Sequence, residues 1–288
     1  MPPNDIGPSG VGAGEHRASP SAALVRACHP EPTATVTLVA VALAGASGRP
    51  AFGIAAVGAA VLAGQLSVGW HNDWLDAERD RANLRVDKPL VGGAVSRRTV
   101  GTVAAVALVL CVPLSLLSGW RAGSAHVAAV LLAWAYNAWL KGTVWSWVPY
   151  AASFALLVSF ISLGRPGHPA PPWWAPTAAA LLGVGAHLAN TLPDLEGDVA
   201  TGVSGLPHRL GPSRSVTAAA GLMLGASAVV ALGPGRPGWT AAGLAVAAAL
   251  VVGGVLAFRR GREAVLFRAA MAVALVDVAM LISRGGQL

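Results

Sequence analysis

Two acidic segments carry the side chains of this sequence that are best suited to chemistry. The first runs from Asn72 to Asp80 and the second, 118 positions later, runs from Asn190 to Asp198; both read N-x-x-x-D-x-E-x-D. Several carboxylates without sulfur ligands suit a hard cation such as Mg²⁺, which takes a few carboxylates together with substrate phosphates and water. The two segments therefore predict a magnesium site for a phosphate-bearing substrate.

Helical periodicity places the aspartates of each segment on one face. A helix turns by about 100° per residue, so residues four apart lie nearly above one another. Glu78 and Glu196 fall on other faces. The side chains that share a face are Asn72, Asp73, Asp76 and Asp80 in the first segment, and His187, Asn190, Asp194 and Asp198 in the second. We expect His187 either to touch the ligand or to pack between helices.

Basic residues accompany the acidic segments. Arg85, Lys88, Lys141 and Arg209 follow apolar runs and have no obvious acidic partner. Arginine and lysine would take the outer oxygens of a diphosphate that Mg²⁺ bridges to the carboxylates. For each cation taken alone, the alternative is a positive charge that only sets membrane topology.

The composition predicts the kind of protein that houses this site. The chain has 288 residues, of which 55% are hydrophobic and 11% are charged, against about 25% charged in soluble domains. Apolar runs near the length needed to cross a bilayer recur along the chain. They lie at 33–48, 51–71, 99–119, 123–140, 143–163, 173–193, 214–233, 238–257 and 264–283. We predict an all-α polytopic membrane bundle of about nine transmembrane helices, in two related halves around a central cavity.

The distribution of positive charge predicts the orientation and the domain boundary. With the N-terminus inside and nine spans, 15 of the 20 lysines and arginines lie in cytoplasmic segments and 5 outside, as the positive-inside rule requires. Both acidic segments then open to the cytoplasm. Residues 1–24 are rich in Pro, Gly, Ser and Ala, which predicts a disordered cytoplasmic tail, with residues 25–288 as the membrane domain.

Other features exclude some functions. The net charge of +7 is spread over short loops rather than along one face, so we expect no nucleic-acid partner, and we infer no obligate protein partner. Asp277 lies within the last apolar run, where we expect it to have a structural partner in the bundle. A tryptophan cluster is expected to form an interfacial belt or, as a sharper alternative, to stabilise a cation: Trp134, Trp139, Trp145 and Trp147.

On these motifs the sequence resembles the UbiA family of intramembrane prenyltransferases, over about residues 24–285. Asn72-Asp73-x-x-Asp76-x-x-x-Asp80 resembles its first acidic motif, and Asn83-x-Arg85-x-x-Lys88-Pro89-Leu90-x-x-Gly93 resembles the continuation, where relatives generally carry Arg at the position of Lys88. Asp194-x-x-x-Asp198 with the later Arg209-Leu210-Gly211 resembles its second motif. Tyr136 and Lys141 resemble a Tyr/Lys pair that ends the fourth helix, here spaced by five instead of four.

The resemblance implies a membrane-embedded transferase that moves an isoprenyl group from an allylic polyprenyl diphosphate to an electron-rich, lipophilic acceptor. The implied metal ligands of two Mg²⁺ ions are Asp73, Asp76, Asp80, Asp194 and Asp198. The implied catalytic residues are Asp76, Asp80, Asp194, Asp198, Lys141 and Tyr136, and the implied substrate-binding residues are Asn72, Arg85, Lys88, Asn190, Arg209 and His187.

Two other classes remain as alternatives. A secondary transporter also combines repeats with charged residues in the membrane, although its charges interrupt helices at the midplane instead of lying at helix ends. An intramembrane aspartyl protease needs only two facing aspartates. The sequence does not select the acceptor or the length of the isoprenyl chain.

Overall fold

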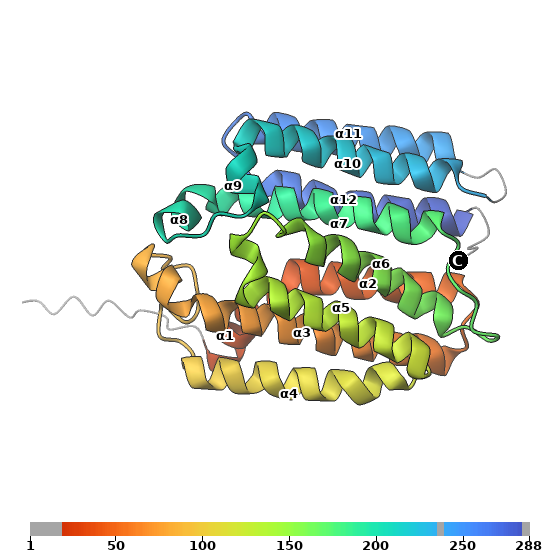
Figure 1. Cartoon of the computed structure of the whole chain (residues 1–288), viewed down its shortest axis with the longest axis horizontal. Coiled ribbons are helices and arrows are strands. Elements are labelled where there is room, and N and C mark those ends of the chain that lie inside the picture. The colour runs from red at the N-terminus through yellow and green to blue at the C-terminus, as the bar shows by residue number, and fades with distance from the viewer. Residues whose placement is uncertain (1–18, 235–238, 284–288) are drawn as a thin grey trace, which may run out of the picture.

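The computed structural model describes residues 19–234 and 239–283, and this part of the chain is all-helical. The long helices run roughly side by side (Figure 1). They are α2 (Pro30–Ala46), α3 (Ala51–Ala82), α4 (Arg97–Leu116), α5 (Trp120–Ala138), α6 (Trp147–Leu163), α7 (Trp174–Thr191), α10 (Pro212–Leu232), α11 (Thr240–Phe258) and α12 (Ala264–Ser283). Short helices lie at one end of the bundle: α1 (Pro20–Ala27), α8 (Leu195–Ala200) and α9 (Leu206–Leu210).

Each apolar run of the sequence coincides with one of these long helices. Within the described residues, α3, α4, α10, α11 and α12 are long and apolar enough to cross a membrane, and α6 is a shorter apolar helix. Large apolar side chains also remain exposed on the outside of α4, where Val109 is 69% exposed and Val106 52%. Apolar side chains facing outward suit lipid and would be unfavourable in water. The chain is therefore a multi-pass membrane protein.

The predicted disordered tail does not reach residue 24. Residues 1–18 lie outside the described residues, whereas helix α1 begins at Pro20. Ser19 caps this helix by accepting a hydrogen bond from the Ala22 amide at 3.3 Å, and proline is favourable in the first turn. Trp70 of α3 donates to the Leu24 carbonyl at 2.9 Å. These contacts order a segment whose composition alone indicates disorder.

The first acidic segment extends a membrane helix. Helix α3 continues past the apolar run to Ala82 and contains the whole segment from Asn72 to Asp80. Its carboxylates therefore keep the helical spacing that the sequence predicts.

The second acidic segment does not continue α7 as one helix, contrary to the prediction. Helix α7 ends at Thr191, a 3₁₀ turn covers Leu192–Asp194, and α8 begins at Leu195. Pro193 explains the break, because proline has no amide hydrogen and its ring clashes with the preceding turn of an α-helix. Asp194 thus lies on a 3₁₀ turn and Asp198 on the short helix α8. Helix α8 lies across from the end of α3 (Figure 1).

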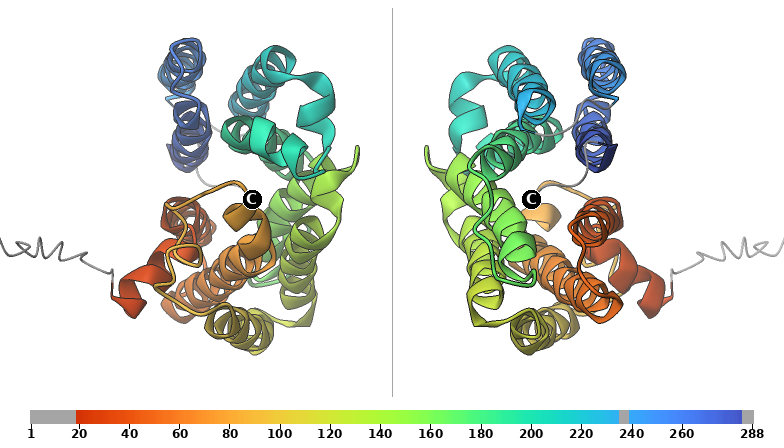
Figure 2. Two further views of the ribbon diagram at one scale, coloured as in Figure 1. Left: turned by 90° about the vertical axis from the view of Figure 1, so that its left-hand side faces the viewer. Right: turned by 90° about the vertical axis from the view of Figure 1, so that its right-hand side faces the viewer.

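The long helices surround a central space. Views along the bundle show them arranged in a ring, with α2 and α12 completing it (Figure 2). Buried apolar side chains from α2, α3, α6, α7 and α12 form one core cluster, which includes Val57, Phe160 and Ile161. A second cluster joins α7, α10, α11 and α12 around Leu188, Met223 and Leu266. These clusters hold the walls of the cavity described next.

Candidate active site

A cavity of about 1050 Å³ lies inside the ring, and its two ends differ in character. Close to the short helices its wall is polar and charged; further along the bundle the wall is mostly apolar, from residues such as Val39, Leu157 and Ala178. The predicted residues that line the polar end are Asn72, Asp76, Asp80, Arg85, Lys88, Tyr136, Lys141, Asn190, Asp194 and Asp198. The fold therefore brings both acidic segments to one chamber.

Asp76 is the most heavily bonded carboxylate of the first segment. Arg79 donates to Asp76 Oδ1 at 2.9 Å, and the Lys141 ammonium donates to the same oxygen. Asn72 donates to Asp76 Oδ2 at 3.2 Å. The Asn137 amide lies 3.4 Å from Asn72 and fixes its position. Asp76 is thus oriented at the cavity wall by cations and an amide.

Residues that follow each acidic segment contact the second segment at the polar end. Arg85 donates to Asp194 Oδ1 at 2.6 Å, and Asn83 donates to the Gly197 carbonyl at 3.2 Å. His208 lies 3.3 Å from Asp198. A loop that follows the first segment therefore touches the second segment directly.

Asp73, one of the predicted metal ligands, does not line the cavity, whereas Asn72, Asp76 and Asp80 do. It is 2% exposed, and its Oδ1 oxygen is bound by His29 at 2.9 Å and by Lys88 at 2.8 Å. Asp73 is one helical position, or about 100°, from Asn72, which turns its carboxylate toward the turn between α1 and α2. In this position Asp73 holds His29 and Lys88 at the edge of the cavity.

The oxygen ligands of this chamber fit Mg²⁺ bound together with a phosphate group. No three Asp, Glu, His or Cys side chains within the described ranges converge as a complete metal site. Mg²⁺ does not need such a cage, because it binds through one or two carboxylates and completes its shell with phosphate oxygens and water. Asp76 and Asp80 on one side and Asp194 and Asp198 on the other supply carboxylates of that kind.

Burial and neighbouring carboxylates shift the pKa values of the cations that lie outside the membrane helices. Hydrogen bonds to Asp87 and the ion pair with Asp194 raise the pKa of Arg85. Burial acts to lower the pKa of Lys88, but the attraction of Asp73 outweighs it, so that the pKa is raised. Burial lowers the pKa of Lys141 even though Asp76 acts in the opposite direction. An anionic ligand placed beside Lys141 would therefore stabilise its charged form.

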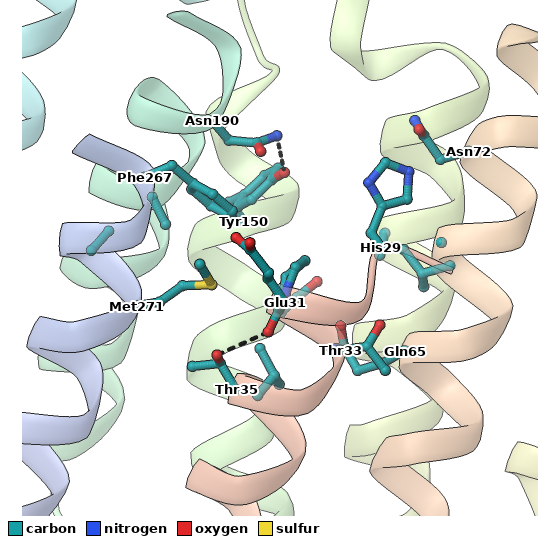
Figure 3. Close-up of a pocket in the computed structure, with 18 of the residues that line it drawn as sticks. His29, Glu31, Thr33, Thr35, Gln65, Asn72, Tyr150, Asn190, Phe267 and Met271 are labelled. Atoms are coloured by element: carbon teal, nitrogen blue, oxygen red, sulfur yellow. Dashed lines mark hydrogen bonds between the residues drawn. The ribbon is translucent and has the colours of Figure 1, made fainter. Parts of the chain in front are cut away.

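Aromatic rings lie where the polar end meets the apolar part. The rings of Tyr136 and Tyr150 meet edge to face with centroids 5.1 Å apart. Tyr150 accepts a hydrogen bond from Asn190 at 3.5 Å, and both point into the opening that Figure 3 shows, with Phe267 beside them. The two tyrosine rings form part of the cavity wall.

Two predicted binding residues lie outside the cavity wall. His187 is 1% exposed and its Nε2 lies 3.0 Å from the Ser146 hydroxyl, so it packs between helices, which was one of the two expectations for it. Arg209 lies exposed on α9 and is not among the lining residues. Glu196, expected on another face, does line the cavity because α8 changes direction after Pro193.

The four tryptophans of the predicted cluster do not line the cavity, although Trp174 of α7 does. Trp139 and Trp145 are 65% and 60% exposed. Trp134 stacks on His71 with centroids 3.7 Å apart and donates to Ser67. Their positions favour the belt and packing roles over contact with a cation.

Three lining residues could not be singled out from the sequence. His29 has a left-handed backbone (φ 56°) at the turn before α2 and lines the cavity (Figure 3). Tyr150 and Asn137 become recognisable only when α5 and α6 are placed against α3 and α7. A histidine before a proline-rich helix start is the one weak signal among them.

Comparisons with known proteins agree with this architecture. The model of the UbiA prenyltransferase family matches residues 33–276. The chain is 35% identical over 185 residues to the bacteriochlorophyll synthase 33 kDa chain of Cereibacter sphaeroides, a match that covers 59% of this chain and 59% of that protein. It thus spans about three fifths of the length of this curated relative.

Solved structures share the fold. A UbiA homolog from Aeropyrum pernix K1, in its apo form, matches with a TM-score of 0.71 at 22% identity, over 88% of this chain and 97% of that one. A UbiA homolog from Archaeoglobus fulgidus, bound to GPP and Mg²⁺, matches with a TM-score of 0.64 at 17% identity, over 90% and 97%.

Proposed function

Because the chain belongs to the UbiA prenyltransferase family, we propose that it transfers an isoprenyl group from an allylic polyprenyl diphosphate to an electron-rich, lipophilic acceptor, with Mg²⁺ as cofactor. One observation carries the proposal: carboxylates of both acidic segments and the cations Arg85, Lys88 and Lys141 line the polar end of one largely apolar cavity. The charged diphosphate would bind at the polar end, and the hydrocarbon isoprenyl chain would occupy the apolar part. The cavity of about 1050 Å³ is at the upper end of usual ligand sites, which suits two substrates.

Each residue has a definite task in this proposal. Asp76, Asp80, Asp194 and Asp198 would hold Mg²⁺, with Asn72 and Asn190 beside them. The bound metal supplies positive charge that neutralises the departing pyrophosphate. Arg85, Lys88 and Lys141 donate hydrogen bonds to the outer phosphate oxygens, which strengthen as negative charge develops there. In the free protein these cations are paired with carboxylates instead, as Arg85 is with Asp194.

The reaction then separates charge inside an apolar chamber. The allylic C–O bond breaks, its electron pair leaves with the pyrophosphate, and an allylic cation remains. The acceptor donates an electron pair to the terminal allylic carbon and loses a proton. Tyr136 and Tyr150 present aromatic rings at the boundary of the two regions, where their faces can stabilise positive charge. The apolar wall excludes water that would otherwise capture the cation.

The position of the site in the bundle also supports the membrane orientation that we propose. The acidic segments, α8 and α9 lie at the same end of the bundle as α1 (Figure 1). The many basic residues of the loops at this end favour the cytoplasmic side. We therefore place the mouth of the cavity and the N-terminus in the cytoplasm, with nine membrane crossings, in the cell membrane. Labelling of single cysteines introduced at Arg81 and Arg121 would test this, with only the former reactive from the cytoplasm.

Release of pyrophosphate from farnesyl or geranylgeranyl diphosphate with Mg²⁺ tests the function. The purified protein is compared with Asp76→Asn and Asp194→Asn, which keep size and remove one charge. Loss of one charge-stabilising group from such a site lowers turnover by about 10²–10³-fold. Equal rates in the parent protein and both variants would show that the metal and diphosphate assignments are wrong.

A further inference from the structure

The structure places one carboxyl group in the apolar part of the cavity. Residues of α12 that line it recur every three or four positions, as one face of a helix does: Phe267, Met271, Ala274, Asp277 and Leu281. Asp277 therefore lies on the cavity face of α12. It is only 7% exposed.

The side chain beside this carboxyl is Ser227 of α10, the kind of structural partner that the sequence suggests, but it does not satisfy both carboxyl oxygens. Asp277 Oδ1 is buried without a hydrogen-bond partner among the described residues. Ser227 of α10 lies beside it, yet its hydroxyl is also without a hydrogen bond of good geometry. Other polar side chains on this wall are satisfied: Ser153 donates to the Ala129 carbonyl at 2.9 Å, and His126 bonds Ser115 at 2.7 Å. Asp277 is therefore an exception on this wall.

The cations of the cavity are too distant to pair with Asp277. Arg268, the nearest of them along α12, precedes it by nine residues, or about 14 Å at 1.5 Å per residue. The other lysines and arginines that line the cavity, Arg26, Arg79, Arg85, Lys88 and Lys141, belong to the polar end. A buried carboxyl with an oxygen that accepts no hydrogen bond is costly in an apolar environment, and an acidic side chain inside a membrane protein marks a functional site.

We propose that Asp277 is a specificity-determining residue that binds a hydrogen-bond donor, a hydroxyl or an amine, on a lipophilic substrate. This inference rests on the proposed function. A plain isoprenyl chain offers only hydrocarbon at this depth and would leave the carboxyl unsatisfied. The donor group therefore belongs either to the acceptor or to the far end of an oxygenated isoprenoid. Both sources present the same chemistry to Asp277.

Matched probes separate the two sources. In the first arm, binding of farnesyl and geranylgeranyl diphosphates with Mg²⁺ is compared with binding of analogues hydroxylated at the terminal methyl. In the second arm, farnesol is compared with its methyl ether, which cannot donate a hydrogen bond. All affinities are measured by equilibrium dialysis with the full-length protein in lipid nanodiscs.

The parent protein is expected to bind the hydroxylated member of one pair about tenfold more tightly, the effect of one buried hydrogen bond. The arm in which this occurs identifies the source. Asp277→Leu abolishes the preference, and Asp277→Asn, which keeps the shape and an acceptor oxygen, retains a weaker one. Leu275→Met, an apolar change on the exposed face of α12 away from the cavity, keeps it.

Equal affinities for both members of every pair in the parent protein would overturn the role of Asp277, and this comparison needs no variant to fold. If no diphosphate binds with Mg²⁺, the proposed function fails instead. The comparison of farnesol with its methyl ether still tests Asp277 in that case. Failure of the proposed function can therefore be distinguished from failure of the role proposed for Asp277.

Discussion

Arg85 and Asp194 are 109 positions apart in the chain and form an ion pair with 2.6 Å between Nη1 and Oδ1. The pair joins the loop after α3 to the turn after α7, so it links the two acidic segments across the polar end of the cavity. A diphosphate that binds there would meet a guanidinium already oriented toward the second segment.

Replacement of Arg85 tests whether this guanidinium serves the substrate. We expect Arg85→Ala to lower kcat/KM for pyrophosphate release by about 10–100-fold, because a charge-assisted hydrogen bond is lost in the transition state. Arg81→Ala is the control, since Arg81 is exposed and does not line the cavity. Equal rates for the two variants would exclude a role for Arg85 in binding the diphosphate.

Removal of divalent cations tests the role of the carboxylates. A chelator should abolish pyrophosphate release, and added Mg²⁺ should restore it, because Asp76, Asp80, Asp194 and Asp198 offer carboxylate oxygens to the metal at the cavity wall. We further expect Asp198→Asn to require a higher Mg²⁺ concentration for half-maximal rate. Glu78→Gln is the control, because Glu78 is exposed and pairs with Arg97 outside the cavity. Full activity in the chelator would contradict the metal site.

Ser146 is predicted to stabilise the packing behind Tyr136 and Tyr150, because it contacts His187, which lies against both rings. Its buried hydroxyl accepts from the Leu206 amide at 3.0 Å and lies 3.0 Å from His187. Ser146→Ala leaves these groups without their partner, which costs about 1–3 kcal/mol. The midpoint of thermal unfolding in detergent should fall, whereas Ser213→Ala, at an exposed position, should leave it unchanged. Equal midpoints would mean that water replaces the Ser146 hydroxyl.

Gly69 is predicted to be required by the close approach of two segments. A Cβ atom at Gly69 would lie 2.4 Å from the Cys28 carbonyl oxygen, which belongs to the backbone of the turn that carries His29. Gly69→Ala should therefore lower thermal stability and displace His29 from Asp73.

The matched control for this prediction is Gly221→Ala, also inside a helix, where a Cβ meets nothing within 4 Å. That change should leave the protein as stable or add about 0.5–1 kcal/mol, because alanine favours helices over glycine. If the two alanine variants unfold at the same temperature, the close approach of Cys28 does not require glycine at position 69.

Helical content and the acidic segments were predictable because both depend on local rules. The apolar runs fix where helices form in a membrane, since the backbone must satisfy its own hydrogen bonds there. The spacing of Asn72, Asp76 and Asp80 needed only the helical repeat, and α3 retains it to Ala82. The second segment failed this rule at Pro193, whose break in the helix outweighs the periodicity.

The sequence alone determined that this protein is a helical membrane protein with two related acidic segments, because composition and periodicity act over short distances along the chain. Only the tertiary structure decided which side chains meet. In the folded protein Asp73 bonds His29 and Lys88, and Asp194 pairs with Arg85. His187 is buried against Ser146, and Asp277 lies in the cavity wall. Those contacts join residues tens to more than a hundred positions apart, and their geometry depends on how whole helices pack.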